Sequence, residues 1–201
     1  TETLENDYRL IALDNRGAGV SDKPHQSDAY GTKMVEDVRR LMDHLKLDSA
    51  HIVGYSLGGF ITLKFAATYP ERCISISPMG AGYEPTRNAA VWTALDSLSS
   101  QLKAGKPIGP LVGIVDSTAP PPSFVHRAFM KVMTGYINDP LALAGIIDGL
   151  PQLMLESNEL NKLTMPVNSI VGKDDVLARA AYALKDAVPH TQLTVVSEAD
   201  H

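Results

Sequence analysis

A short serine segment flanked by glycines is the first feature of this sequence that could do chemistry. Gly54-Tyr55-Ser56-Leu57-Gly58 has the pattern G-x-S-x-G, and it lies between the apolar run 51–53 and a proline-free stretch that continues to Tyr69. A serine on a tight turn between a strand and a helix presents its hydroxyl at the helix N-terminus, where free N–H groups favour a developing anion. The pattern predicts a nucleophile at Ser56, and a Gly/Ser-rich turn before a helix is the plainer alternative.

A serine nucleophile needs a base within hydrogen-bond reach and a third group that orients the base. Candidates for both follow downstream in the order Ser, Asp, His. Gly172-Lys173-Asp174-Asp175 comes directly after the apolar run 166–171, and Asp200-His201 comes shortly after the run 192–196. Side chains that follow parallel strands gather at the carboxyl edge of the sheet, so these groups can meet there. The imidazole would then take the serine proton while the carboxylate holds the imidazole.

The elements that must position these residues alternate between short apolar runs and helical patterns. Apolar runs predict strands at 8–13, 50–54, 73–77, 166–171 and 192–196. Helical spacing of apolar residues predicts helices near 34–45, 57–69 and 177–187. This alternation is typical of an α/β fold, with a mostly parallel central sheet and flanking helices.

Residues 80–164 break the alternation and predict a helical lid insertion between two core segments, 1–79 and 165–201. Helices are expected at 89–102, at 123–136, and after Asp139-Pro140, which reads as an N-cap and first helical residue. Aromatic and methionine side chains of the insertion are expected to roof an apolar pocket. The predicted substrate-binding residues are Tyr55, Trp92, Phe129 and Met133, and His126 is a further candidate, although a lone histidine more often has a structural role.

Four segments together resemble the α/β-hydrolase fold superfamily, in its lid-bearing branch of serine esterases, lactonases and C–C hydrolases. They are residues 14–21 (DNRGAGVS), which match its D-x-R-G-x-G-x-S loop, the serine turn, the G-x-x-D turn that ends at Asp175, and the final histidine. The resemblance implies a catalytic triad of Ser56, Asp175 and His201, with Asp174 as the fallback acid. It also implies the Leu57 N–H as one oxyanion-hole donor.

The family also has three strands before the segment that matches 8–13, and a helix after the histidine. We therefore expect this sequence to be an internal piece of a longer polypeptide, in which the missing third strand would carry the second oxyanion donor. Without that strand, 8–13 cannot pair in the usual way with 50–54, and both edges would stay exposed. One missing oxyanion donor is worth about 10²–10³ in rate, so the piece alone is expected to be a poor catalyst.

The expected function is that of a serine hydrolase, which cleaves a carboxylic ester or lactone of a small, partly apolar substrate through an acyl-enzyme. Two alternatives stay open. One is C–C bond hydrolysis or perhydrolysis on the same triad, and the other is a ligand-binding, receptor-like module with little turnover. Asp14 and Arg16 are expected to form a structural ion pair that steadies their loop.

The composition disfavours several other classes of protein. Lys and Arg number 18 against 23 Asp and Glu, with no basic stretch, so nucleic-acid binding is not expected. No apolar run approaches the roughly 18 residues of a membrane helix. The motifs H-x-H, H-E-x-x-H and C-x-x-C are missing, so neither metal nor cofactor is expected. The single cysteine, Cys73, is compatible with a reducing compartment, and a cytoplasmic location is expected.

Overall fold

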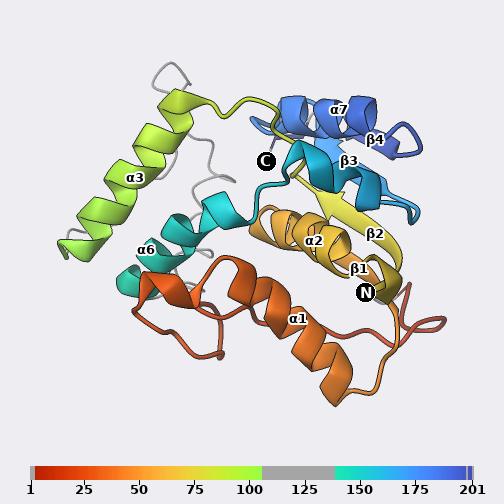
Figure 1. The fold of residues 1–201 in the computed structure, drawn as a ribbon, viewed down its shortest axis with the longest axis horizontal. Coiled ribbons are helices and arrows are strands. Elements are labelled where there is room, and N and C mark those ends of the chain that lie inside the picture. The colour runs from red at the N-terminus through yellow and green to blue at the C-terminus, as the bar shows by residue number, and fades with distance from the viewer. Residues whose placement is uncertain (1–2, 106–138, 198, 201) are drawn as a thin grey trace.

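The structure is a computed structural model that describes residues 3–105, 139–197 and 199–200. Its centre is a parallel sheet of four strands, whose order across the sheet is their order along the chain (Figure 1). The strands are β1 (Ala50–Tyr55), β2 (Cys73–Met79), β3 (Asn168–Gly172) and β4 (Gln192–Val196). The predicted α/β fold with a mostly parallel sheet is confirmed, and every predicted strand except the first forms.

The register of the sheet brings the carboxyl ends of the strands to one edge. Tyr55 pairs with Met79, Met79 with Ile170, and Ile170 with Thr194. These four residues form a row across the sheet close to the points where the strands end. The loops that follow the strands therefore begin side by side, which is the arrangement in which open α/β sheets build their sites.

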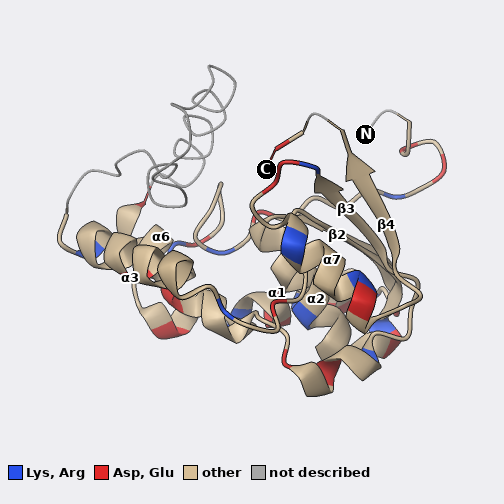
Figure 2. Ribbon diagram, turned by 90° about the horizontal axis from the view of Figure 1, so that it is seen from above, with Lys and Arg blue, Asp and Glu red and all other residues tan. Residues whose placement is uncertain are grey.

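Three helices cover one face of the sheet: α1 (Thr32–His44), α2 (Leu57–Thr68) and α7 (Ala178–Ala187) (Figure 2). Helices α2 and α7 each connect two consecutive parallel strands, and connections of one hand place their helices on the same face of the sheet. Helix α2 is apolar almost all round, and its side chains Leu63, Phe65 and Ala66 are fully buried between the sheet and α1. This pattern is expected of a helix enclosed in a core.

Helices α3 (Ala89–Lys103) and α6 (Pro140–Gly149) come between β2 and β3 in the chain and pack against each other away from the sheet (Figure 1). They enclose a second cluster of buried side chains, made of Leu98, Leu102, Ala144 and Ile147. The predicted cap of α6 is confirmed, because the Asp139 carboxylate accepts hydrogen bonds from the N–H groups of the first turn. The helix expected at 123–136 lies outside the described residues.

Short 3₁₀ turns complete the described elements: η1 (Ser27–Ala29), η2 (Pro70–Arg72), η3 (Leu150–Gln152) and η4 (Ser157–Lys162). Helix α6 contacts η1 and packs closely against the residues that follow η1 in the chain. A methyl group at Gly145 would lie 2.4 Å from the ring of Tyr30, and one at Gly149 would lie 2.4 Å from the amide nitrogen of Gly31. Glycine at these two positions lets α6 approach the core closely. No described helix is long and apolar enough to cross a membrane.

The strand predicted at 8–13 is wrong. The segment is irregular, and its large apolar side chains are exposed, among them Leu10, Ile11 and Leu13. An apolar run becomes a strand only where a neighbouring edge accepts its backbone hydrogen bonds. Within the described residues, β1 pairs with β2 alone, so no backbone ladder joins this segment to the sheet. The Tyr8 ring meets the edge of the His51 ring, with centroids 5.7 Å apart.

Candidate active site

Ser56 lies at the turn between β1 and α2 and has a strained backbone. Its φ is 53° and its ψ is −117°, a combination that costs a non-glycine residue about 1–3 kcal/mol. The surrounding structure enforces it, since the Ser56 N–H donates to Met79 O at 2.8 Å. The Ser56 carbonyl accepts from the N–H groups of Gly59 and Phe60 as α2 begins. Ser56 therefore has the strand–turn–helix setting that the sequence predicts for it.

Two glycines allow this turn to form, each for a different close contact. A methyl group at Gly54 would lie 2.1 Å from Gly58 O and 2.6 Å from the Thr62 hydroxyl. One at Gly59 would lie 2.6 Å from Ala81 Cβ. The first contact brings β1 against α2, and the second brings the exit of β2 against the same helix turn. At Gly58 itself no atom lies within 4 Å of such a methyl group.

Leu57, the predicted oxyanion donor, is the first residue of α2. The N–H groups of the first turn point toward the helix N-terminus, where the partial positive charge of the helix is concentrated. Carbonyl oxygen that gains negative charge beside Ser56 would meet this positive end. The position suits the predicted role, which stays a proposal.

Asp175 follows β3 and is the inward-facing member of the acidic pair. It is only 6% exposed, and its Oδ1 accepts the Leu177 N–H at 2.7 Å. Asp174, the fallback acid, is exposed, and its backbone N–H donates to Ala199 O at 3.0 Å. A carboxylate buried with a backbone donor is the better candidate for holding a charged imidazole.

The loop after β4 folds onto the loop after β3. The Lys173 N–H donates to Val196 O at 2.9 Å, and a methyl group at Gly172 would lie 2.4 Å from Ala199 O and 2.7 Å from Asp200 O. Residues 199–200 thus cross the end of β3 in direct contact with it. His201 itself lies outside the described residues, as do His126, Phe129 and Met133.

Tyr55, next to Ser56, is close enough to Asp175 and Asp200 for their charges to act on its hydroxyl. Burial raises the pKa of its hydroxyl, and the negative charges of Asp175 and Asp200 raise it further. The side chain stays 42% exposed at the end of β1. The predicted residues Tyr55, Ser56, Leu57 and Asp175 are therefore gathered at the carboxyl edge of the sheet, together with the residue that precedes His201.

The prediction that Arg16 forms an ion pair with Asp14 is wrong. Arg16 instead forms a two-pronged pair with Asp37 of α1, with both N–O distances 2.6 Å. Asp14 accepts the Val20 N–H at 3.0 Å and closes its own loop. The role is structural, as predicted, but the sequence carries no signal for a partner 21 residues away on a helix.

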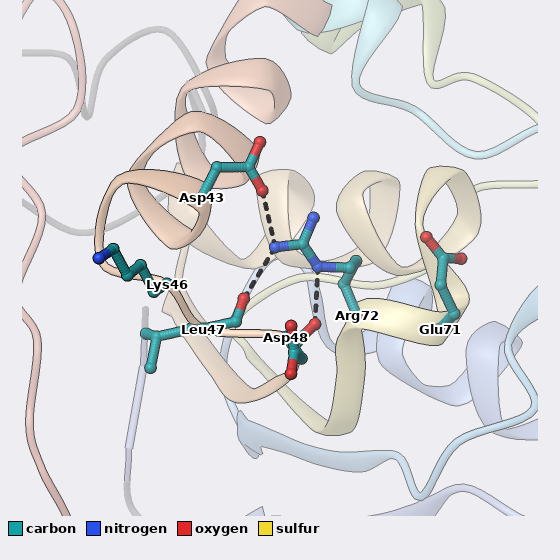
Figure 3. A pocket seen from close by; sticks show the side chains of 6 residues that line it. All are labelled: Asp43, Lys46, Leu47, Asp48, Glu71 and Arg72. Atoms are coloured by element: carbon teal, nitrogen blue, oxygen red, sulfur yellow. Dashed lines mark hydrogen bonds and ion pairs between the residues drawn. The ribbon is translucent and has the colours of Figure 1, made fainter.

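A surface hollow of about 530 Å³ lies at the opposite edge of the sheet (Figure 3). The residues that line it are Asp43, Lys46, Leu47, Asp48, Glu71 and Arg72. Figure 3 shows Arg72 reaching across it to Asp43 and to the carbonyls of Leu47 and Asp48, at 2.7–2.9 Å. These bonds hold the entries of β1 and β2 together, so we assign the hollow a structural role. The described residues contain no cluster of acids, histidines or cysteines that could bind a metal.

Comparisons with known proteins agree on one fold. The family model described as alpha/beta hydrolase fold matches residues 2–106. A 2-hydroxy-6-oxo-6-phenylhexa-2,4-dienoate hydrolase of Comamonas testosteroni is 40% identical over 75 residues, which are 37% of this chain and 26% of that protein. The chain spans about half or less of the length of the curated relatives it matches.

Solved structures extend the likeness over the whole chain. A carboxylesterase structure from the thaumarchaeon Nitrososphaera gargenis matches with a TM-score of 0.74 and 22% identity, covering 100% of this chain and 75% of that one. The enol-lactonase of Burkholderia xenovorans LB400 matches with a TM-score of 0.73 and 19% identity, covering 97% of this chain and 75% of that one. At such identities the likeness shows the fold.

Proposed function

The chain belongs to the α/β-hydrolase fold family, and from that premise we propose that it carries the catalytic core of a serine hydrolase that cleaves a carboxylic ester or lactone of a small, partly apolar substrate. The observation that carries the proposal is the backbone of Ser56, with its positive φ of 53° at the start of α2. Strain of this kind persists where the surrounding structure enforces it, and it concentrates at active sites. Relatives and fold neighbours that are hydrolases support an enzymatic role.

In the proposed mechanism, the Ser56 hydroxyl attacks the carbonyl carbon as His201 takes its proton. Negative charge that forms on the carbonyl oxygen is stabilised by the Leu57 N–H at the start of α2. His201 then returns the proton to the departing alcohol, which leaves an acyl group on Ser56. Water, activated by the same imidazole, releases the acid. Asp175 orients the imidazole and stabilises its charged form.

The substrate would lie against Tyr55 on the core and against Trp92, Phe129 and Met133 of the segment 80–164, which we propose as a lid. The close approach of α6 to Tyr30 and Gly31 supports this, because it seats one end of the insertion firmly on the core. We expect a small-molecule substrate and no cofactor.

Cleavage of a carbon–carbon bond by the same triad is the second candidate. It is favoured by the similarity to the 2-hydroxy-6-oxo-6-phenylhexa-2,4-dienoate hydrolase of Comamonas testosteroni over 75 residues. Both reactions would use Ser56, Asp175 and His201 in the same places. Parallel assays with simple esters and with a vinylogous 1,5-diketone acid separate the two, because only the second reaction cleaves the diketone.

Labelling with a fluorophosphonate probe tests the proposal directly in the full-length protein. The probe forms a covalent bond with an activated serine, so the wild type should label at Ser56 and the Ser56→Ala variant should not. Ser100→Ala is the matched control, because Ser100 is an exposed serine of α3. Labelling should slow toward acid pH, since a protonated imidazole cannot take the serine proton. A folded wild type that resists the probe would refute the serine-hydrolase proposal.

A further inference from the structure

Residues 79–83, which we call the bridge segment, leave the end of β2 and lie directly against the serine turn. Met79 O accepts the Ser56 N–H at 2.8 Å, which ties the start of the segment to the proposed nucleophile. Two residues later, Ala81 is fully buried, and its Cβ lies 2.6 Å from where a methyl group of Gly59 would be. The bridge segment is therefore fixed beside the first turn of α2.

The same segment is bonded to the elements that carry the proposed acid. The Gly80 N–H donates to Ile170 O of β3 at 2.9 Å. The Tyr83 N–H donates to Ala180 O at 3.0 Å, and Ala180 belongs to the first turn of α7. One short stretch of chain thus joins the serine turn, β3 and the start of α7, so its thickness sets how far apart these elements lie.

Gly82 is the point of closest approach between the bridge segment and α7. A methyl group at Gly82 would lie 2.2 Å from both the carbonyl carbon and the oxygen of Ala180, and 2.5 Å from the amide nitrogen of Ala181. The φ of Gly82 is not in the left-handed region, so glycine is needed here for the contact and not for its backbone freedom. Ordinary contact begins at 3.4 Å, so alanine would force the two backbones about 1.2 Å apart.

The backbone that Gly82 touches also holds the Asp175 carboxylate. Leu177 donates its N–H to Asp175 Oδ1 at 2.7 Å. Its carbonyl oxygen accepts the N–H groups of Ala180 and Ala181, at 3.0 and 3.2 Å. A displacement of the first turn of α7 is therefore passed to the carboxylate through two consecutive hydrogen bonds.

We propose that Gly82 is a positioning residue for the reaction, which sets the place of Asp175 relative to Ser56 by leaving no side chain between the bridge segment and α7. The inference rests on the function proposed for these two residues. Catalytic groups must be held within about 0.5 Å of their working geometry, and a misplacement of about 1 Å can cost about 10² in rate. The clearance that Gly82 provides is of that size.

An added methyl group would move α7 more readily than the bridge segment. The segment cannot retreat toward α2, because Ala81 is fully buried against Gly59. Helix α7 has an outer face in solvent, where Tyr182 is 48% exposed. We therefore expect Gly82→Ala to shift the first turn of α7 outward and to take the Asp175 carboxylate with it.

The test measures the rate constant of fluorophosphonate labelling at Ser56 in the full-length protein, corrected for the folded fraction. Gly82→Ala should slow labelling by about 10–100-fold. Leu184→Ala is the matched control, because Leu184 is a fully buried side chain of the same helix. Its loss leaves a cavity and lowers the urea midpoint, but it adds no atom at the first turn, so labelling should stay within about twofold of wild type.

Two readouts distinguish positioning of the acid from general destabilisation. A displaced carboxylate stabilises the charged imidazole less, so Gly82→Ala should move the acid limb of the labelling profile to lower pH, whereas Leu184→Ala should leave it in place. Asp175→Asn alone should slow labelling strongly. Adding Gly82→Ala to Asp175→Asn should slow it by less than about twofold more, because both changes act through the same carboxylate.

A second variant covers the case in which Gly82→Ala does not fold. Replacement of the Tyr83 backbone amide by an ester keeps the side chain and removes only the N–H that donates to Ala180 O. This change loosens the seat of α7 without adding volume. It should slow labelling by a smaller factor and shift the acid limb in the same direction.

A spectroscopic measurement separates this inference from the proposed function. The Leu177 amide proton, bonded to a carboxylate, should resonate downfield in protein labelled with ¹⁵N-leucine. It should move upfield in Gly82→Ala and in the Tyr83 ester, and stay in place in Leu184→Ala. A wild type that does not label, but whose Leu177 amide responds in this way, would refute the hydrolase proposal and leave Gly82 as the residue that places the Asp175 carboxylate.

Three results would overturn the inference while the wild type labels normally. They are wild-type labelling in a folded Gly82→Ala, a wild-type pH profile in the Tyr83 ester, and a loss from Gly82→Ala that is equally large with and without Asp175→Asn. The third result would show that Gly82 acts on the rate by a route that does not pass through Asp175.

Discussion

Replacement of Gly54 by alanine should disrupt the serine turn, although the change adds a single methyl group. The new Cβ would lie 2.1 Å from Gly58 O, whereas ordinary contact begins at 3.4 Å. The backbone of β1 or α2 would have to move by about 1.3 Å, because the obstructing atom is a carbonyl oxygen that cannot rotate away. The Thr62 hydroxyl, 2.6 Å from the same Cβ position, blocks movement of the methyl group in a second direction.

The expected cost is large for one methyl group. Overpacking of a rigid interior costs about 1–3 kcal/mol and more where backbone must move, so we expect Gly54→Ala to lower the free energy of unfolding by about 3 kcal/mol or more. The shift would also displace Ser56, two residues along the chain. Fluorophosphonate labelling should therefore slow by a larger factor than the loss of folded protein explains.

Gly58→Ala is the matched control, because it changes the other glycine of the same motif. Its Cβ would enter open space, and alanine is favoured over glycine inside a helix by about 0.5–1 kcal/mol. Urea denaturation followed by circular dichroism should show the midpoint falling for Gly54→Ala and rising slightly for Gly58→Ala. Equal midpoints for Gly54→Ala and wild type would refute the steric account of the turn.

Three further predictions concern two ion pairs and the buried cysteine. Burial raises the pKa of Glu159, but a backbone N–H and the Lys64 ammonium at 2.7 Å hold it below its usual value of 4.5. The stability that results is complete above pH 4.5 and is lost as the pH falls further. Glu159→Gln should lower the free energy of unfolding by about 1–3 kcal/mol at pH 7. Urea titrations at pH 7 and 3.5 should show a smaller difference in stability between the two pH values for this variant than for the wild type. Arg16→Lys breaks the two-pronged pair with Asp37 and should cost about 1–3 kcal/mol, with a double-mutant cycle to Asp37→Asn giving the coupling. Burial raises the pKa of the Cys73 thiol to about 12, so a disulfide reagent should modify it only as fast as the protein unfolds, and rapid reaction of the native protein would contradict this.

Much of the fold was predictable because its signals are local. Strand and helix patterns depend on residues a few positions apart, and so do helix caps. The Asp139-Pro140 pair predicts the start of α6 correctly for this reason, and the G-x-S-x-G pattern predicts the turn at Ser56. The order of the elements then predicts a parallel sheet, since each strand is followed by a helical connection.

Partnerships between distant residues could not be predicted in this way. The run 8–13 has the composition of a strand, but a strand also needs a neighbouring edge within hydrogen-bond reach, and no local pattern shows whether the folded chain brings the segment to one. Arg16 has an acid two residues before it, yet its partner is Asp37, because the fold brings α1 to the loop.

The sequence by itself determined the kind of fold, the position of the serine turn and the chemistry that three residue types could perform. The tertiary structure alone decided that Asp175 is buried while Asp174 faces solvent, and that Gly54 is sterically required while Gly58 is not. The reason is one of range. Backbone preference and periodicity act over a few residues, whereas burial, charge pairing and close approach depend on which segments meet in space.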